Sequence, residues 1–392
     1  MIEKVCLEEL KNITSFNEKM SNVEIANEIS RVADKTRIVI QRMKDPEQQF
    51  PEECPVNDRY QFRENIGWTE GFWTGINWLL TEVSDEKLFA EVAKKADKNF
   101  VYRIKNHIVT DHHDLGFLFS LSTVAEYKIT GNSEMREASL LAADCLLARY
   151  WEKAGVIQAW GDPNDLTQQG RMIMDCCMNL PLLYWASEET GDLKYRHAAE
   201  RHIENASNYL VREDASTFHT FYMDVETGLP KFGSTHQGYR DDSCWARGQA
   251  WGVYGFALSA RYLNKPEYFE LAKKLANYFL NRLPENLICY WDLDLDGAAE
   301  RDTSSMTIVI CGLLEMLDQP WFTAEERQQY QQVVATLMKA LQSYRTTNED
   351  GFLTESVYNF PKKNGVKVPC IWGDYYYLEA LVRLSTKPTL FW

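Results

Sequence analysis

The chain has 392 residues, of which 45% are hydrophobic and 25% are charged, and its formal net charge is −15. A chain of this size is a globular protein that buries roughly three-quarters of the surface its unfolded form exposes. The acidic balance argues against nucleic acid and anionic membranes as partners. We therefore expect binding to neither of them.

The termini and the cysteines indicate the compartment. The N-terminal sequence MIEKVCLEELKNIT carries charges throughout, and nowhere do eighteen apolar residues follow one another without a charge. The nine cysteines are scattered, odd in number and free of any Cys-x-x-Cys pair. This pattern indicates neither a disulfide framework nor a zinc site, and it is typical of reduced thiols. We expect a cytoplasmic protein without a membrane span.

Two kinds of predicted helix alternate along the chain. Segments that are apolar almost all round predict buried helices, which begin near Trp68, Asp114, Asp175, Trp245, Thr303 and Trp372. Turn signals between them introduce amphipathic segments, as in GNSEMREASLLAADCLLARYW, GDLKYRHAAERHIENASNYLV and NKPEYFELAKKLANYFLNRL. The amphipathic segments predict outer, half-solvated helices.

This alternation, without a convincing run of alternating strand residues, predicts an all-α fold. We expect an (α/α)6 barrel, a toroid of six helical hairpins, over a single domain of residues 1–392, with residues 1–20 as an N-terminal extension. An open solenoid of helix pairs is the alternative, but its repeats would be shorter and more uniform. In a barrel all inner helices start at the same end, so their first turns converge on one mouth.

Tryptophans gather at the expected mouth. We assign to this end the tryptophans Trp68, Trp73, Trp160, Trp245, Trp251 and Trp372. Indole faces stack on the apolar faces of sugar rings, while amides and arginines bind hydroxyl and carboxylate groups. The pattern favours a carbohydrate ligand. The alternative is that each tryptophan only packs in the core.

Asp114 and Asp175 begin consecutive buried helices and should face each other across the mouth. Paired carboxylates suit glycosyl chemistry, because one can donate a proton while the other stays charged. Helix capping is the alternative, and it is stronger for Asp114 than for Asp175. Asp175 lies among Met, Ile and Cys in MIMDCC, where burial should raise the pKa of its carboxyl group. Pro181 lies either in a first turn capped by Asn179 or at a kink.

Other chemistries find little support. His112, His113 and Asp114 are adjacent, but neighbouring side chains point in different directions and no His-x-x-x-His pair accompanies them. We expect no metal and no other cofactor. The sequence has no Gly-x-Ser-x-Gly motif, phosphate-binding glycine loop or dinucleotide fingerprint, which leaves hydrolysis.

Four segments carry a family resemblance. HHDLGF, RMIMDCCMNLPLL, HQGYRDDSCWARGQAWGVYGFAL and IWGDYYYLEAL, in this order, resemble the unsaturated glucuronyl hydrolases of glycoside hydrolase family 88. The resemblance runs from about Trp68 to the C-terminus. It implies an (α/α)6 barrel that releases 4,5-unsaturated glucuronic acid from the non-reducing end of oligosaccharides left by polysaccharide lyases acting on chondroitin, hyaluronan or heparin.

The same resemblance implies roles for residues. Asp175 matches the catalytic acid and base, and Asp114 matches a second essential carboxylate. The expected substrate-binding residues at the sugar site are Trp68, His113, Trp160, His219, Gln237, Arg247 and Trp251. The nearest alternative is an unsaturated rhamnogalacturonyl hydrolase. A sugar epimerase, which usually needs histidines as acid and base, and a sugar-binding toroid without activity are alternatives from other classes.

The segment SVYNFPKKNGVKVPCIWGDYYY places Asn359, Lys362, Lys363 and Lys367 beside the expected mouth. Ammonium groups near the pocket of an acidic protein can bind sulfate on the second sugar through charge-assisted hydrogen bonds. The resemblance implies a serine and lysine pattern in this loop in streptococcal-type members that accept sulfated chondroitin disaccharides. This sequence departs from it, because it has asparagine and lysines where serines would be expected. We expect Lys362 and Lys363 to bind substrate and to favour sulfated disaccharides. A solvated lysine turn is the alternative.

Overall fold

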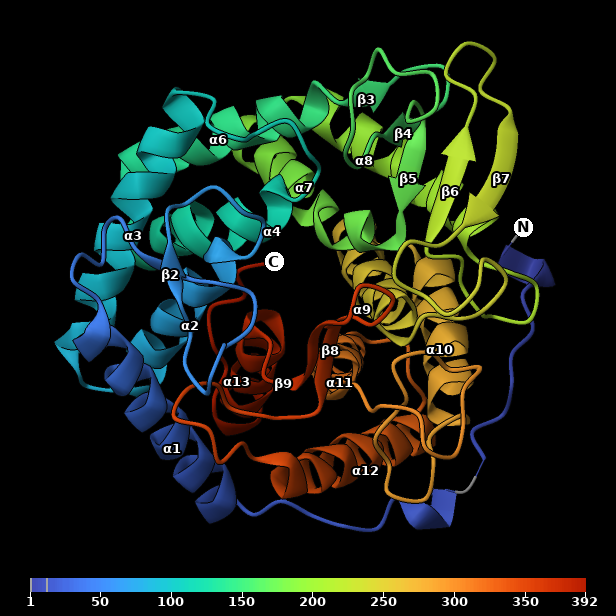
Figure 1. Cartoon of the computed structure of the whole chain (residues 1–392). Coiled ribbons are helices and arrows are strands. Elements are labelled where there is room, and N and C mark those ends of the chain that lie inside the picture. The colour runs from blue at the N-terminus through green and yellow to red at the C-terminus, as the bar shows by residue number, and fades with distance from the viewer. Residues whose placement is uncertain (1, 12) are drawn as a thin grey trace.

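The computed structural model describes residues 2–11 and 13–392, and its helices form two concentric layers (Figure 1). The inner layer consists of α2 (Glu70–Val83), α4 (Leu115–Phe119) continued by η3 (Ser120–Val124) and α5 (Ala125–Thr130), α7 (Leu180–Thr190), α9 (Ala246–Leu263), α11 (Thr303–Leu317) and α13 (Ile371–Ser385). The outer layer consists of α1 (Asn22–Arg42), α3 (Lys87–Lys105), α6 (Ser133–Leu147), α8 (Leu193–Asn205), α10 (Pro266–Leu280) and α12 (Ala324–Leu341). Shorter helical turns are η1 (Ile2–Lys4), η2 (Ile13–Ser15), η4 (Met174–Met178), η5 (Ala206–Leu210) and η6 (Gln342–Tyr344).

The inner helices form a closed ring. Each contacts the next in chain order, from α2 through α4, α7, α9 and α11 to α13, and α13 packs against α2. The outer helices α3, α6, α8, α10 and α12 cover the inner helices that precede them, and α1 covers α13. Because the first outer helix pairs with the last inner one, the two ends of the chain complete one hairpin and close the ring.

Burial follows the two sequence patterns. Helix α9 buries every residue from Ala246 to Ala260, as expected for a segment that is apolar nearly all round. Helix α12 instead buries one face, with Tyr330, Val334, Leu337 and Leu341 at helical spacing. The prediction of buried and half-solvated helices in alternation is thus confirmed. None of the helices in the described ranges is long and apolar enough to cross a membrane.

The loops contain short antiparallel strands, which the sequence analysis did not expect. In the described residues, the strands pair as β1 (Phe50–Pro51) with β2 (Phe62–Arg63), β3 (Tyr150–Trp151) with β4 (Val156–Ile157), β8 (Ser356–Asn359) with β9 (Asn364–Val368), and β5 (Arg171–Ile173) with β6 (Thr220–Met223) and β7 (Pro230–Ser234) in the order β5-β6-β7. Runs this short cannot show a reliable alternation of apolar and polar residues. The all-α prediction is therefore right for the two layers and wrong for the loops.

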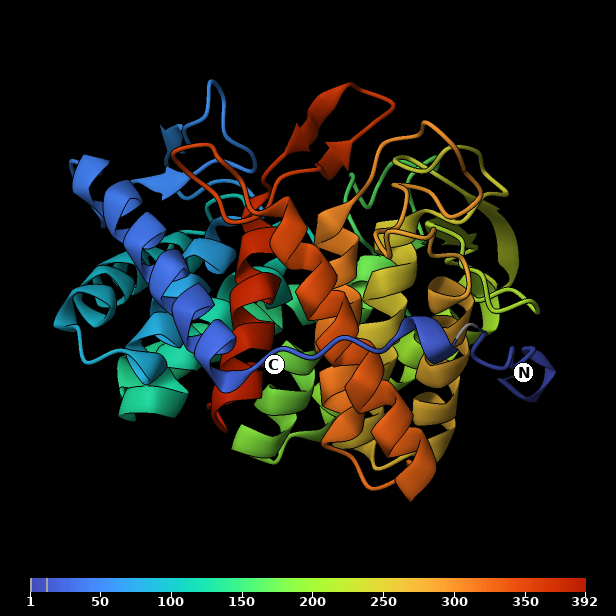
Figure 2. The ribbon, with the colours of Figure 1, turned by 90° about the horizontal axis from the view of Figure 1, so that it is seen from below.

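The hairpins mark one end of the ring. Figure 2 shows the β8–β9 hairpin and the β1–β2 segment at the same end, beyond the N-terminal ends of α11 and α13. Figure 1 shows β8 and β9 over the interior of the ring. The first turns of the inner helices therefore lie beneath these loops.

The chain after α13 turns back into the ring (Figure 1). Trp392 is 2% exposed, and its ring stacks on Tyr376 with centroids 6.0 Å apart and planes 11° apart. Its indole Nε1 donates to Glu379 at 2.9 Å, and Arg261 donates to its carbonyl oxygen at 3.1 Å. The Trp392 ring also lies 6.0 Å from Phe117, on the helix that follows Asp114. The tail thus fills space inside the ring of inner helices.

Removing this indole should destabilise the ring. We expect Trp392→Ala to lower the free energy of unfolding by about 3–5 kcal/mol, because a large buried ring is lost and Glu379 loses a hydrogen-bond donor. Chemical denaturation monitored by circular dichroism measures the change. Thr389→Ala is a matched control in the same tail, since Thr389 bonds to Glu82 through its backbone N–H. Equal stability of the two variants would contradict a packing role for Trp392.

Candidate active site

A cavity of about 330 Å³ opens where the inner helices begin. Its lining residues are Trp68, His113, Asp114, Trp160, Asp175, His236, Gln237, Arg247, Tyr358, Asn359 and Lys362. A roomier cavity of about 750 Å³ lies between α1 and the turn after α2, but it is lined by none of the site residues expected from the sequence. We therefore place the site in the smaller cavity.

The inner helices bring these residues together through their first turns. Asp114 directly precedes α4, Asp175 lies in η4 ahead of α7, and Arg247 is in the first turn of α9. Pro181 lies in the first turn of α7, so the alternative of a kink is wrong. Asn179 precedes that helix, but its side chain makes no capping hydrogen bond to it within the described residues. The expected convergence on one mouth is confirmed.

Asp175 holds a proton more tightly than a free aspartate does. Burial raises the pKa of its carboxyl group to about 7, and the negative charge of Asp114 adds to the effect, while Arg247 opposes it. Its Oδ1 atom is buried and has no hydrogen-bond partner among the described residues. The direction of the pKa shift expected from MIMDCC is confirmed.

Asp114 stays charged beside it. Burial opposes the charged form, but the adjacent His113 and His112 and the more distant Arg103 lower the pKa of Asp114 below its usual value. His113 Nε2 lies 3.3 Å from Asp114 Oδ1, and His112 Nδ1 lies 3.4 Å from Oδ2. Burial lowers the pKa of His113 to about 4, so its ring is neutral near pH 7. Two neighbouring carboxyl groups with pKa values pushed apart can act as acid and base.

Capping does not explain Asp114. It occupies the position before α4, yet its side chain makes no capping hydrogen bond to any described residue. The carboxylate faces the cavity instead. The capping alternative raised by DHHDLGF is therefore wrong.

Arg247 fixes one wall of the cavity. Its guanidinium lies between the rings of Trp245 and Trp372, 4.5 and 4.9 Å from their centroids. It donates to the backbone carbonyl oxygens of Val357 and, at 2.7 Å, of Tyr358. Because both acceptors are on β8, Arg247 holds in place the strand that contributes Tyr358 and Asn359 to the lining.

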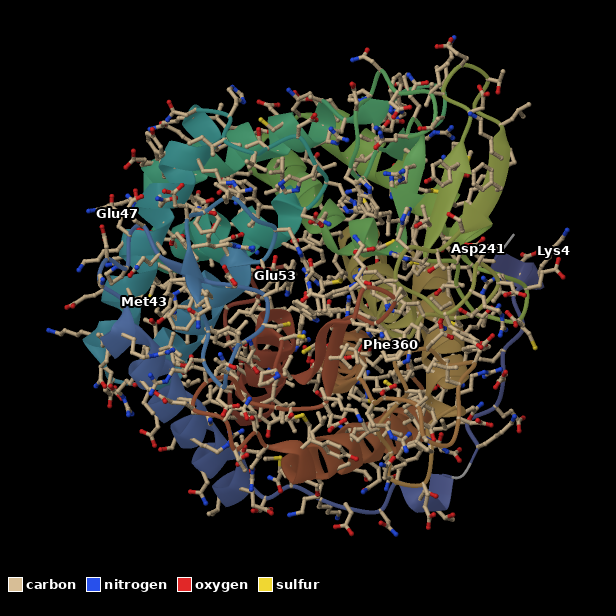
Figure 3. All side chains as sticks on the ribbon, in the orientation of Figure 1. Lys4, Met43, Glu47, Glu53, Asp241 and Phe360 are labelled. Atoms are coloured by element: carbon tan, nitrogen blue, oxygen red, sulfur yellow. The ribbon has the colours of Figure 1, made fainter. Side chains whose placement is uncertain are left out.

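The β8–β9 hairpin has further anchors. Gln237 Nε2 donates to the Tyr358 carbonyl oxygen at 3.0 Å, and Trp68 Nε1 donates to the Tyr358 hydroxyl at 3.3 Å. Phe360 stacks on Trp291 with centroids 4.5 Å apart. Figure 3 shows the labelled Phe360 over the interior of the ring, among densely packed side chains. The hairpin is thus fixed at Tyr358, one of its lining residues, and at Phe360.

Trp160 also lines the cavity. The Arg171 guanidinium lies 4.9 Å from its ring centroid, and the His236 ring lies 5.2 Å from it. The backbone N–H groups of His236 and Gln237 donate to His219 Nδ1, at 3.0 and 3.3 Å. His219 therefore holds the turn that presents His236 and Gln237 to the cavity.

Three of the expected binding residues, His219, Trp251 and Lys363, are not among the residues that line this cavity. His219 is buried behind the turn it holds. Trp251 is 1% exposed and packs between Phe117 and Tyr376, because it lies one helical turn deeper along α9 than Arg247. Lys363 is exposed and has a φ of 52°, which turns the chain away after Lys362.

The other expected binding residues line the cavity, namely Trp68, His113, Trp160, Gln237, Arg247 and Lys362. Of the remaining tryptophans, Trp73, Trp245 and Trp372 are buried core residues, as the packing alternative held. His236 and Tyr358 also line the cavity, and neither was expected there from the sequence. Both could have been predicted from adjacent residues that were expected at the mouth, because His236 precedes Gln237 in HQGYRDD and Tyr358 precedes Asn359 in SVYN. No cluster of three or more His, Cys, Asp or Glu suited to a metal ion occurs in the described ranges.

Comparisons with known proteins show the family of the chain. Residues 39–387 match the family described as Glycosyl Hydrolase Family 88. The chain is 42% identical, over the whole of both chains, to the unsaturated chondroitin disaccharide hydrolase of Streptococcus pneumoniae (strain ATCC BAA-255 / R6). It is 41% identical to the unsaturated glucuronyl hydrolase of Bacillus sp. (strain GL1), over 92% of this chain and 97% of that one.

Solved structures are similar over almost the whole chain. The crystal structure of unsaturated glucuronyl hydrolase from Streptococcus agalactiae has a TM-score of 0.95 at 41% identity and covers 99% of both chains. A mutant of that enzyme complexed with dGlcA-GalNAc6S has a TM-score of 0.88 at 38% identity, again over 99% of both chains. The chain belongs to glycosyl hydrolase family 88.

Proposed function

We propose that this glycosidase releases 4,5-unsaturated glucuronic acid from the non-reducing end of unsaturated oligosaccharides derived from glycosaminoglycans, by hydrating the enol-ether double bond. The observation that carries the proposal is the pair of carboxyl groups in one cavity, Asp175 with a pKa of about 7 beside the charged Asp114. The relatives named unsaturated chondroitin disaccharide hydrolase and the structure complexed with dGlcA-GalNAc6S support the substrate class.

Asp175 serves as acid and then as base. Its carboxyl group delivers a proton to carbon 4 of the unsaturated sugar, and the positive charge that develops at carbon 5 is shared with the ring oxygen. The resulting carboxylate takes a proton from the water that attacks carbon 5. The product is a hemiketal, which opens and expels the remaining saccharide, leaving a linear keto-uronate. One group performs both transfers because its pKa lies near the working pH.

Asp114 supports this chemistry without exchanging the proton. Its negative charge makes loss of the Asp175 proton less favourable, and its oxygens can accept hydrogen bonds from ring hydroxyl groups. Trp68 and Trp160 offer faces for the sugar ring on two sides of the cavity. Holding the sugar ring in a fixed orientation between these two tryptophans adds to the rate acceleration that proton transfer provides.

We further propose that the ring of helix pairs is an (α/α)6 barrel and that residues 1–392 form one catalytic domain. Residues 1–20 would be an extension along the outer helices, which the bonds of Glu8 to Arg282 and of Lys11 to Asn281 support. A cytoplasmic setting without nucleic-acid or membrane partners is supported by the net charge of −15 and by the nine free cysteines.

The assignment of Asp175 is tested by Asp175→Asn. We expect the wild-type protein to remove the ultraviolet absorbance of unsaturated chondroitin disaccharide, and the variant to lose about 10²–10⁴-fold in turnover, because an amide cannot donate and retake the proton. Asp34→Asn, at a side chain 62% exposed on α1, is the control and should keep full activity.

Three results would count against the proposal. Binding of the disaccharide by the wild type without loss of absorbance indicates a sugar-binding toroid, and a preference for pectin-derived disaccharides indicates a rhamnogalacturonyl hydrolase. Substantial turnover by Asp175→Asn would show that Asp175 is not the catalytic acid. The variant should unfold at pH 8 no more easily than the wild type. Folding raises the pKa of Asp175 from 3.8 to about 7, so the wild type loses stability as the pH rises between these values, and this loss is complete at pH 8.

The pH dependence follows from the same pKa. We expect kcat/KM to fall above about pH 7 with the slope of a single proton, because the free enzyme then loses the proton of Asp175. Asp114→Asn removes the neighbouring charge and should move this fall to lower pH, in addition to reducing turnover. Initial rates measured between pH 5 and pH 9 check both points. A wild-type profile that stays flat to pH 9 would contradict the assignment.

The sulfate preference now rests on Lys362, which lines the cavity, rather than on Lys363. We expect Lys362→Ala to lower the ratio of kcat/KM for sulfated over unsulfated unsaturated disaccharides by about 3- to 10-fold at low salt, through loss of a charge-assisted hydrogen bond. Lys363→Ala is the matched control, since it removes the same charge from the next residue. A ratio unchanged by Lys362→Ala at every salt concentration would show that selectivity lies elsewhere.

A further inference from the structure

The helix that follows Asp114 is capped from another part of the chain. The first N–H groups of a helix have no partner within it and need an acceptor from outside. Asp114 stands at the position that usually supplies the acceptor, yet its side chain caps no N–H group in the described structure. The backbone N–H of Phe117, the third residue of α4, instead donates to Asn179 Oδ1 at 2.8 Å.

Asn179 belongs to the segment that carries Asp175. Its side-chain Nδ2 donates to the Asp175 carbonyl oxygen at 3.2 Å, and its backbone N–H donates to the Cys176 carbonyl oxygen at 2.8 Å. The side chain is fully buried. Since an amide oxygen only accepts and an amide nitrogen only donates, one orientation satisfies both contacts. A single buried amide therefore bonds the helix after Asp114 to the turn that holds Asp175.

The two backbones also touch at this point. A Cβ atom at Gly116 would lie 2.3 Å from Asn179 Cα and 2.7 Å from its carbonyl oxygen. No side chain fits at such distances, so glycine is required for the approach. Gly116 is two residues from Asp114, and Asn179 is four residues from Asp175. The separation of the two carboxyl groups is thus set by direct contact between the segments that carry them.

We propose that Asn179 is a positioning residue for the two carboxyl groups. It caps α4 in place of Asp114, which leaves the Asp114 carboxylate facing the cavity, and it ties that helix to the turn of Asp175. The inference rests on the proposed function and deepens it. Asn179 is not among the residues that line the cavity, so it acts through the two aspartates and not on the sugar.

Loss of this amide offers Asp114 another partner. Aspartate is among the best capping residues, and the free N–H of Phe117 would lie within its own first turn. A carboxylate that turned to cap this N–H would move away from the sugar and from Asp175. Besides Asp114 and Asp175, the charged or titratable side chains that line the cavity are His113, His236, Arg247, Tyr358 and Lys362, and Cys176 and Cys177 follow Asp175 in the chain. Among these groups Asp114 supplies the negative charge that raises the pKa of Asp175, so its departure would make Asp175 lose its proton at lower pH.

The test is Asn179→Ala, with three measurements. Turnover on the unsaturated disaccharide should fall about 10- to 100-fold, since displacements of about 1 Å cost that much. The fall of kcat/KM at high pH should move to lower pH. A crystal structure of the variant should show a carboxylate oxygen of Asp114 within hydrogen-bonding distance of the Phe117 N–H.

A second variant guards against a failure to fold. Asn179→Asp keeps an acceptor oxygen for the Phe117 N–H and nearly the same shape. We expect it to retain more turnover than Asn179→Ala, and its added negative charge should shift the high-pH fall upward and not downward. Opposite shifts from two substitutions at one position would not arise from general loosening of the fold.

Asn77→Ala is the matched control. Asn77 is also fully buried, and its Nδ2 donates to the carbonyl oxygen four residues earlier, that of Trp73, at 2.9 Å. It lies on α2 and, within the described residues, bonds to neither segment that carries an aspartate. We expect Asn77→Ala to lower the thermal midpoint to a similar degree while turnover and the pH profile stay as in the wild type.

The outcomes separate this inference from the proposed function. Turnover and a pH profile in Asn179→Ala that match the wild type, with stability alone reduced, would overturn the positioning role. So would a crystal structure in which Asp114 has not moved. High activity of Asp175→Asn would instead refute the acid assignment itself, whatever Asn179→Ala does. The position of Asp114 in the crystal is independent of activity and decides between the two cases.

Discussion

The site depends on burial of the Asp175 carboxyl group, which keeps its proton near neutral pH mainly because water is excluded there. Burial leaves one oxygen of Asp175 without a hydrogen-bond partner among the described residues, and the charge of Asp114 adds repulsion. Asp114 remains charged because His112 and His113 lie within 3.4 Å of its oxygens. Neither aspartate is placed where it would stabilise the fold most. Such a loss of stability in favour of activity is common at active sites. The closed ring of helices supplies the stability that the site lacks.

Capping of the helices reflects the same division. The outer helices α1, α6, α8 and α12 begin with side-chain caps from Ser21, Asn132, Asp192 and Thr323. In the described part of the chain the inner helices α2, α4, α7, α9 and α13 have no side-chain cap from the residue that precedes them, and α4 is capped by the distant Asn179. The outer helices α3 and α10 also begin without one. Polar side chains at the starts of inner helices are therefore free to face the cavity. The inner helix starts also direct the positive ends of their dipoles toward it, which favours an anionic sugar in a protein of net charge −15. Helix α11 is the exception, since Asp302 caps it through the Ser304 N–H.

Much of the fold could be predicted from the sequence, because a buried helix and a half-buried helix differ in pattern over many residues. The environment of Asp175 was predictable too, since its apolar neighbours adjoin it in MIMDCC. The depth of a residue along its helix could not be predicted from the sequence. Arg247 and Trp251 share a face of α9, but only Arg247 reaches the cavity. Contacts between distant loops were also beyond the sequence, as between Gln237 and the Tyr358 carbonyl. The strand that presents Tyr358 is too short to leave a pattern.

The residues proposed for the chemistry and the residue proposed for selectivity lie on different kinds of element. The aspartates stand on the starts of inner helices, where a shift of one backbone would disturb the whole ring. Lys362 stands instead in a turn between two short strands, and it is exposed. Arg247 joins the two regions, because its guanidinium is fixed between two tryptophans while its donors hold β8. The Asp302 Oδ2 atom lies 3.8 Å from Arg247 Nη1 and offsets much of the charge of Arg247. Arg247 therefore counteracts only part of the rise in the pKa of Asp175. Substitutions in the turn can therefore change which second sugar is accepted without altering the proton affinity of Asp175.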